Sequence, residues 1–368
     1  PAPTLLERVS AVLARRYYDR DFRSTELPRL TREFLPTARQ ADNPAAQRAV
    51  VREFLARFSV SHLALLSRSG YDHMRAELAA VPTPTVGFQL ARRDVRGLDR
   101  YFVDWVLENG PGARAGILRG DELVQIDGLP VGSHPRLDWS LDDPALPDAP
   151  QHRILCEEGE TLRLTLRRSP TDVRRVIVET ERFSGWDATV ASVRRIQAGG
   201  MTFGYVHLWY IQLEGPARLL RQLQRTRFRD CDGWIVDLRG RGGSMDEAER
   251  VIAELVPGAP ERPLVLLCDA NTRSAKEVIA HEVRARGAAT IVGERSAGAV
   301  IPASFRAVSE DAVLMYPSMT LGRYTRALEG VGVVPDVAAA DVLPFAGGAD
   351  PILERALEWL GGDVRCRS

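Results

Sequence analysis

PLVLLCDANTRSAKEVIA, residues 263 to 280, joins an apolar run to a segment with helical spacing, and this junction decides the class of fold. The run PLVLLCD has the length and composition of a buried strand, and a helix is predicted to begin at or near Ser274. The same alternation continues through the chain from about residue 171, in GYVHLWYI, PARLLRQLQR, GWIVDLRG, DEAERVIAELV and ATIVGE. Buried strands that alternate with helices predict an α/β core with a largely parallel sheet, whose functional groups gather at the carboxyl ends of the strands.

Two further regions precede this core. Residues 1–80 carry apolar residues at helical spacing and predict a helical N-terminal region. Residues 81–170 consist of short apolar runs separated by turn residues, which is typical of a compact β-rich module, and SHPRLDWSLDDPALPDAP (133–150) is predicted to be a surface loop of it. We therefore predict an α/β multidomain chain in which the core takes residues 171–344 and a last helix and tail take residues 345–368.

The bulk composition excludes several classes of function. Of the 368 residues, 45% are hydrophobic and 27% charged, and 49 basic residues balance 49 acidic ones. Such a chain offers no polycationic surface on average, so we expect no nucleic-acid partner. No run of about 18 apolar residues occurs, and we expect no transmembrane segment.

The four cysteines are widely spaced and form no C-x-x-C pair, which argues against a zinc ribbon or a redox dithiol. They are Cys156, Cys231, Cys268 and Cys366. We expect free thiols, and no motif in the chain requires a metal or a cofactor.

The stretch GWIVDLRGRGGS, residues 233 to 244, carries Gly240, Gly242 and Gly243 directly after a predicted strand. These glycines could simply make a tight turn from strand to helix. They could also let backbone N–H groups point at an oxyanion or a phosphate. No G-K-[ST] follows, so the phosphate-binding loop pattern is not met.

Ser274 and Glu277 have the S-x-x-E spacing of a capping box, yet a serine at a helix N-terminus is also suited to be a nucleophile. Lys276 is the only lysine of the chain. Two residues along a helix turn the side chain by about 200°, so Lys276 points away from Ser274 and is a poor base. Arginine does not deprotonate, and a histidine or carboxylate must therefore activate the serine.

Six histidines are the candidates for this role: His62, His73, His134, His152, His207 and His281. His281 lies two helical turns from Ser274, roughly 10 Å away and beyond hydrogen-bond reach. His207 alternates along an apolar strand, which indicates packing. His62 follows Ser61 at the end of the helical region and is one candidate base among these.

Two sets of motifs resemble a known family. GPGARAGILRGDELVQIDG (110–128) is similar to the PDZ domains of bacterial proteases. DLRGRGGS, PLVLLCDANTRSAKEVIA, GAATIVGERSAG and LEGVGVVPDV resemble, in order, the core motifs of the tail-specific, or C-terminal processing, serine peptidases, including the tricorn-type branch. Together the motifs cover most of residues 60 to 340, and the resemblance implies a core of the crotonase/ClpP-like kind.

The resemblance also implies roles for particular residues. The family nucleophile falls on Ser274, one oxyanion donor on the N–H of Ala275, and the other on Gly243 with Gly242 as the alternative. Ala299 occupies the place of the activating lysine of the lysine-dependent branch, which is a departure from that pattern. The tricorn-type branch uses a Ser-His pair and a glutamate instead, and these match Ser61, His62 and Glu329.

The function implied is that of a serine endopeptidase that cleaves flexible or C-terminal tails of polypeptides. Its PDZ domain would bind the chain end, with the carboxylate loop near Thr85, Val86, Gly87 and Phe88, or would gate the site. Two alternatives are a catalytically inactive peptide-binding scaffold and an acyl-transfer enzyme with a glycine-turn oxyanion hole. The sequence leaves the oligomeric state and the compartment open: an oligomer is possible, and the resemblance favours an extracytoplasmic (periplasmic or secreted) location while tricorn-type relatives can be cytosolic.

Overall fold

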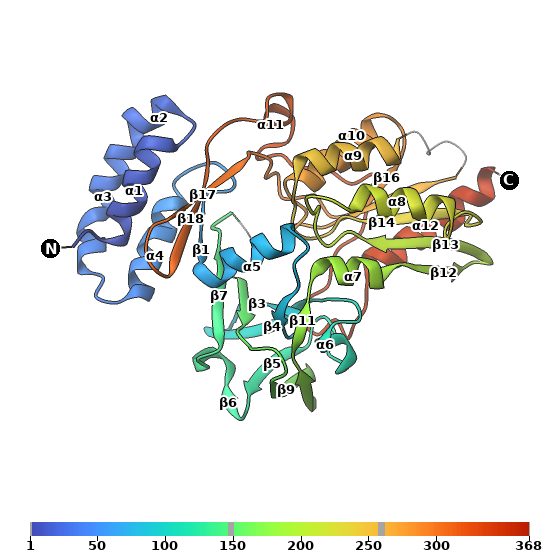
Figure 1. The fold of residues 1–368 in the computed structure, drawn as a ribbon, viewed down its shortest axis with the longest axis horizontal. Coiled ribbons are helices and arrows are strands. Elements are labelled where there is room, and N and C mark those ends of the chain that lie inside the picture. The colour runs from blue at the N-terminus through green and yellow to red at the C-terminus, as the bar shows by residue number, and fades with distance from the viewer. Residues whose placement is uncertain (1, 146–150, 257–261, 368) are drawn as a thin grey trace.

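The computed structural model describes residues 2–145, 151–256 and 262–367. Figure 1 shows a group of N-terminal helices at one end, an α/β core at the other, and a β-rich module below and between them. An 11-stranded sheet and a 6-stranded sheet organise the molecule. None of the helices in these ranges combines the length and the apolar character that a membrane crossing requires.

The N-terminal helices form where their apolar spacing predicts them. Thr4 and Glu7 cap the first helix reciprocally. The apolar faces meet around aromatic rings, where Phe54 packs edge-on against Phe34 and Phe58. The helices of this region are α1 (Leu5–Arg16), α2 (Arg20–Ser24), α3 (Glu26–Gln40), α4 (Pro44–Leu55) and α5 (Arg68–Leu78).

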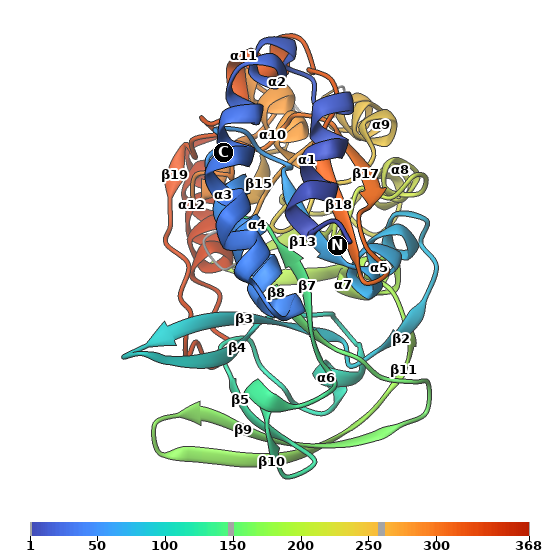
Figure 2. The same ribbon diagram turned by 90° about the vertical axis from the view of Figure 1, so that its left-hand side faces the viewer.

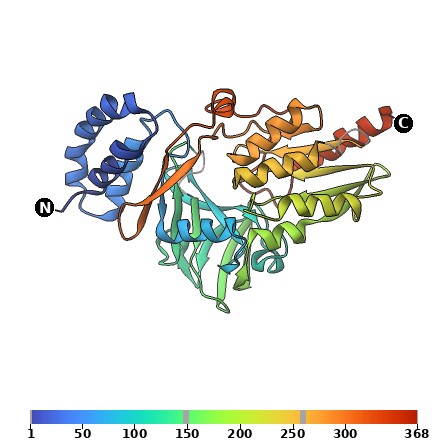
Figure 3. The same ribbon diagram turned by 45° about the horizontal axis from the view of Figure 1, so that its top comes forward.

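The 11-stranded sheet runs through the β module and continues beyond it, in the order β10-β9-β5-β4-β3-β8-β7-β1-β18-β17 with β6 on β5. Strand β1 comes from the N-terminal region, and the hairpin β17–β18 comes from late in the chain and lies between the N-terminal helices and the core (Figure 3). The sheet thus joins the N-terminal region, the β module and the core. The domain boundaries near residues 80, 170 and 344 stay predictions. Its strands are β1 (Ala64–Ser67), β3 (Phe88–Val95), β4 (Leu98–Val106), β5 (Glu122–Ile126), β6 (Leu129–Pro130), β7 (Leu137–Asp142), β8 (Gln151–Ile154), β9 (Thr161–Ser169), β10 (Asp172–Glu179), β17 (Ala303–Ala307) and β18 (Ala312–Pro317).

Part of the segment 133–150 forms a strand instead of the surface loop that its composition predicts. Leu137–Asp142 forms strand β7, which pairs with β1 on one side and with β8 on the other. Leu141 and Asp142 are buried, because β1 supplies partners from about 75 residues earlier in the chain. Residues 146–150 of the expected loop lie outside the described residues.

The core sheet has the order β12-β13-β14-β15-β16-β19. Helices α8, α9 and α10 pack on one face, through residues such as Leu220, Val251 and Val278. Helix α12, the last helix that the sequence predicts, covers the other face with Ile352 and Leu360. The elements are β12 (Arg194–Ala198), β13 (Met201–His207), β14 (Gly233–Asp237), β15 (Leu264–Cys268), β16 (Thr290–Gly293), β19 (Val337–Ala338), α7 (Gly185–Ser192), α8 (Pro216–Arg225), α9 (Met245–Leu255), α10 (Ala275–Ala285), α11 (Arg323–Leu328) and α12 (Pro351–Arg367); the β module adds β2 (Thr83–Thr85), β11 (Glu181–Phe183) and α6 (Pro111–Arg114).

The expectation of a largely parallel sheet needs correction. The neighbouring pairs from β13 through β16 to β19 are parallel. The pairings of the 11-stranded sheet are antiparallel, and so is the pairing of β12 with β13. The alternation of strands and helices therefore describes only the core, while most of the sheet structure in the described residues is antiparallel.

The cysteines agree with the expectation of free thiols. Cys156, Cys231 and Cys268 are unpaired, and the last two are buried. Burial raises the pKa of the Cys268 and Cys231 thiols, which disfavours the reactive thiolate. The side chain of Cys366 lies outside the described part of the chain.

Candidate active site

Ser274 lies where the chain passes from β15 into α10. Its backbone has φ 59° and ψ −128°, which side chains with a Cβ rarely adopt. Its N–H donates to the Ala299 carbonyl oxygen (2.8 Å). Ser274 and Glu277 share one arm of a capping box, in which the Glu277 carboxylate accepts the Ser274 N–H (3.2 Å); the Glu277 N–H donates to the Ser274 carbonyl oxygen (3.0 Å) rather than to the Ser274 hydroxyl. Strain of this kind is frequent at catalytic positions, and it leaves this hydroxyl available at a helix N-terminus.

The glycine turn after β14 lies directly against Ser274. A Cβ at Gly242 would come 2.6 Å from the Ser274 Cβ and 2.7 Å from the Arg273 carbonyl oxygen, so only glycine fits here. Within the described residues, the N–H groups of Gly242, Gly243 and Ala275 have no backbone acceptor. Such donors beside a hydroxyl could receive an oxyanion.

Ser61, His62 and Glu329 form one hydrogen-bonded group. The Ser61 hydroxyl donates to Glu329 Oε2 (3.1 Å), and the Ser61 N–H donates to Glu329 Oε1 (2.8 Å). The Ser61 Oγ also lies 3.0 Å from His62 Nδ1. Because the single hydroxyl proton goes to the carboxylate, Nδ1 must donate to Ser61, which leaves the lone pair of His62 on Nε2.

His62 is buried and strained. Its φ is 54°, and its side chain is only 8% exposed in a bend before β1. Burial and the nearby Arg273 guanidinium lower the pKa of His62 to about 3. The imidazole is therefore neutral at physiological pH, as a general base must be before it accepts a proton.

A short segment links the serine to the histidine group. Ala299 accepts the Ser274 N–H through its carbonyl oxygen, and the N–H groups of Val300 and Ile301 donate to Glu329 Oε2 at 3.0 and 3.2 Å. In the described part of the chain, no hydrogen bond or ion pair joins the His62 ring to Ser274 itself. The structure thus assembles Ser61, His62 and Glu329 in one group and Ser274 with Gly242 in another, and residues 299–301 connect the two.

Glu277 fixes that connecting segment from the side of α10. Its carboxylate accepts hydrogen bonds from the Ser296 hydroxyl and from the N–H groups of Gly298 and Ala299 at 2.7 and 2.8 Å. It also accepts the Ser274 N–H at 3.2 Å. The capping glutamate therefore holds the loop 296–299 against the turn that carries Ser274.

Lys276 is directed away from Ser274, as the helical geometry predicts. Its side chain is buried, and its ammonium donates to the carbonyl oxygens of Arg239 (2.7 Å) and Trp209 (3.2 Å). Burial lowers the pKa of Lys276 to about 7. The lysine thus ties the ends of β13 and β14 to α10.

The loop predicted to bind a chain end is folded on itself. The Thr85 hydroxyl oxygen accepts the Gly87 N–H (3.0 Å), Gly87 has φ 77°, and Val86 and Phe88 are buried. The strand that follows, β3, is paired with β4 on one edge and with β8 on the other, through Leu90↔His152 and Ala91↔Gln151. A peptide that added to this second edge would compete with β8, and the role of the loop stays a prediction.

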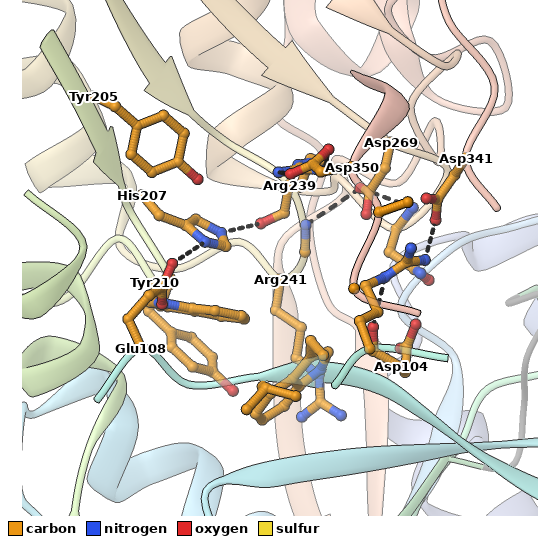
Figure 4. Close-up of a pocket in the computed structure, with 18 of the residues that line it drawn as sticks. Asp104, Glu108, Tyr205, His207, Tyr210, Arg239, Arg241, Asp269, Asp341 and Asp350 are labelled. Atoms are coloured by element: carbon orange, nitrogen blue, oxygen red, sulfur yellow. Dashed lines mark hydrogen bonds and ion pairs between the residues drawn. The ribbon is translucent and has the colours of Figure 1, made fainter. Parts of the chain in front are cut away.

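A cavity of about 260 Å³ lies between the carboxyl edge of the core sheet and the β module (Figure 4). His207 at the end of β13 borders it, with Nδ1 3.5 Å from the Glu108 carboxylate and its ring stacked on Trp209. His207 therefore does more than pack in the core, the role that the sequence pattern indicated, because it also lines this cavity. Other lining residues include Asp104, Tyr205, Tyr210, Arg239, Gly240, Arg241, Asp269, Asn271, Asp341 and Asp350.

Sequence reasoning missed the two arginines that precede the predicted site residues. Arg273 precedes Ser274, and Arg241 precedes Gly242; both are bound by side chains of the β module. Their position next to the site motifs was the available signal, but their partners are far away in sequence. Among the described residues, no three His, Cys, Asp or Glu side chains come together as metal ligands would.

Comparison with family models and known proteins shows what the chain is similar to. Residues 256–339 match the model of peptidase family S41, and residues 102–139 match a PDZ domain. The carboxyl-terminal-processing protease of Synechocystis sp. is 24% identical over 289 residues, which are 70% of this chain and 64% of that protein. The putative tricorn protease homolog 2 of Streptomyces coelicolor is 26% identical over 88% of this chain and 29% of its own length. The chain therefore spans less than two thirds of these relatives.

Solved structures show the same fold. The photosystem II D1 C-terminal processing protease has a TM-score of 0.52 at 20% identity, with 98% of this chain and 97% of that chain covered. The tricorn protease has a TM-score of 0.55 at 15% identity, with 98% of this chain and 37% of that chain covered. The chain is thus similar to carboxyl-terminal-processing proteases, with one segment that matches peptidase family S41 and one that matches a PDZ domain.

Proposed function

We propose that this chain, an S41-type peptidase homologue with a PDZ domain, is a serine endopeptidase that cleaves flexible or C-terminal tails of polypeptides. The observation that carries the proposal is the strained Ser274, which lies at a helix N-terminus against Gly242 and is tied through residues 299–301 to the His62 group. A capping role alone does not call for a strained backbone or for a glycine packed against the serine.

In this mechanism the Ser274 Oγ attacks a peptide carbonyl while its proton passes to His62 Nε2. Glu329 and Ser61 hold the imidazole in the required tautomer. The N–H groups of Ala275 and Gly243, with Gly242 as the alternative, receive the oxyanion. His62 then returns the proton to the leaving amine as the C–N bond breaks, and water releases the acyl group by the same steps.

The Ser-His form of the chemistry fits the residues better than the Ser-Lys form. Ala299 fills the place where the resemblance puts the lysine, and the amine of Lys276 is bound to main-chain carbonyl groups. His62 has no such competing partner on Nε2 among the described residues.

The substrate would be an extended polypeptide. Ser274 lies between the glycine turn and residues 299–301, and an extended chain fits such a position more readily than a folded segment, so flexible tails are preferred. The cavity of about 260 Å³ adjoins the glycine turn through Gly240 and Arg241 and has the size for a substrate side chain. The PDZ domain would act beside it, by binding the tail or by gating the site.

A fluorophosphonate probe tests the assignment, because it reacts with an activated serine in an oxyanion hole. We expect it to label the native protein, and we expect Ser274→Ala to abolish labelling. Ser184, which caps α7 with its hydroxyl, supplies the matched control: Ser184→Ala should label normally. Full labelling of Ser274→Ala would refute the assignment, and native protein that binds peptide tails without labelling or cleavage would favour the inactive scaffold.

A further inference from the structure

We propose that strands β7 and β8 position both oxyanion donors of the site, through Asp143 directly after β7 and Gln151 at the start of β8. The proposal rests on the function proposed above and adds positioning residues from the β module to it. Figure 2 shows β7 rising from the β module toward the core.

The first contact reaches the residue before the nucleophile. Asp143 Oδ2 accepts a hydrogen bond from Arg273 at 3.1 Å, and the two side chains are 1% and 7% exposed. A charge pair this deeply buried fixes its partners, because either charge left alone would remain desolvated. Arg273 is bonded directly to Ser274, whose own N–H and that of Ala275 depend on the path of this backbone.

The second contact reaches the residue before the glycine turn. The Arg241 guanidinium donates to the side-chain oxygen of Gln151, and also to that of Gln89 on β3 at 3.0 Å. Gln89 and Gln151 are both buried. Arg241 is followed by Gly242 and Gly243, so the seam between β3 and β8 holds the turn that supplies the second donor.

The same two strands also border the histidine side of the site. Strand β7 pairs with β1 through Leu65↔Asp142 and Leu66↔Leu141, and β1 begins two residues after His62. Strand β8 occupies the edge of β3 to which a PDZ ligand strand would add. Strands β7 and β8 of the β module therefore lie against three chain segments of the site: the one that carries Ser274, the glycine turn, and the one that carries His62.

A displacement of about 1 Å in a catalytic group can cost on the order of 100-fold in rate. We therefore expect Gln151→Ala and Asp143→Asn each to lower the maximal rate of fluorophosphonate labelling, and kcat for unfolded casein, by about tenfold or more, while KM changes by less than about threefold. Asp143→Glu should recover part of the rate. Asp99→Asn is the matched control, because Asp99 of β4 pairs with Arg92 at 3.1 Å on the exposed surface of the β module, and it should keep the native rate.

Three results would overturn the proposal: native kcat in both variants, a rise in KM alone, or an equal loss in Asp99→Asn. Circular dichroism and the urea midpoint identify variants that fail to fold. If Asp143→Asn is one of these, Gln151→Ala, which leaves Arg241 its bond to Gln89, decides the matter. Native protein that neither labels nor cleaves would instead refute the proposed function, and this inference with it.

Discussion

At the scale of single residues, the site is marked by two side chains held in left-handed backbone. Ser274 has φ 59° and His62 has φ 54°, and neither is a glycine. Each such residue costs on the order of 1–3 kcal/mol and persists only where its surroundings enforce it. At Ser274 the enforcing contacts are the bond from its N–H to Ala299 and the packing of Gly242 against its Cβ.

Glycine at position 274 should therefore stabilise the fold relative to alanine. Both substitutions remove the hydroxyl and abolish labelling, but only glycine adopts φ 59° without strain. We expect Ser274→Gly to exceed Ser274→Ala in free energy of unfolding by about 1 kcal/mol, measured by urea denaturation. If the alanine variant were as stable as the glycine variant, the backbone at residue 274 would not be strained.

The pH dependence of labelling should report the surroundings of His62. Burial, followed by Arg273, lowers its pKa to about 3, so the imidazole stays neutral, and labelling should keep its plateau as the pH falls through 6.5. The unfolded chain takes up a proton near pH 6.5 and the native His62 does not, so stability contributed here is lost as the pH falls from 6.5 toward 3.

Removal of the Arg273 charge should move the acid limb of that profile to higher pH. The double variant Arg273→Gln, Asp143→Asn is compared with Asp143→Asn alone, so that only the arginine charge differs and no buried aspartate is left unpaired. Labelling rates between pH 4 and 8 supply the measurement. Superimposable profiles for the two proteins would exclude an effect of Arg273 on His62.

At the scale of elements, the local part of the site could be predicted from the sequence and the distant part could not. Some parts of the site lie next to breaks in the hydrophobic pattern, where a motif can be recognised from the sequence. They are the turn after β14, the start of α10 and the Ser61–His62 pair. Strand β7 was missed because LDWSLDDP is rich in Asp and lies in a Pro-rich segment, and only its pairing with β1 and β8 makes it a strand. Arg241 and Arg273 were missed for the same reason, since each binds a partner at least 90 residues away.

At the scale of the whole molecule, the 11-stranded sheet connects the N-terminal region, the β module and the core, which the sequence pattern predicts as separate regions. Strand β1 lies between β7 of the β module and β18 from late in the chain, and its Leu65 packs in the core of the N-terminal helices. Residues 299–301, which hold Ser274 and Glu329, lead directly into β17. The site can thus be complete only when this sheet is formed.

A defect in β1 should accordingly unfold the molecule and its site together. Leu65 is 1% exposed, and Leu65→Ala should lower the free energy of unfolding by about 2–5 kcal/mol, because a large buried side chain leaves a cavity. We expect the urea midpoints of the far-UV circular dichroism and of fluorophosphonate labelling to fall by the same amount. Leu98→Ala, at a position 68% exposed in the same sheet, should leave both midpoints unchanged. If labelling kept its native midpoint while the dichroism midpoint fell, the core would carry an assembled site without β1, and the coupling through the sheet would be wrong.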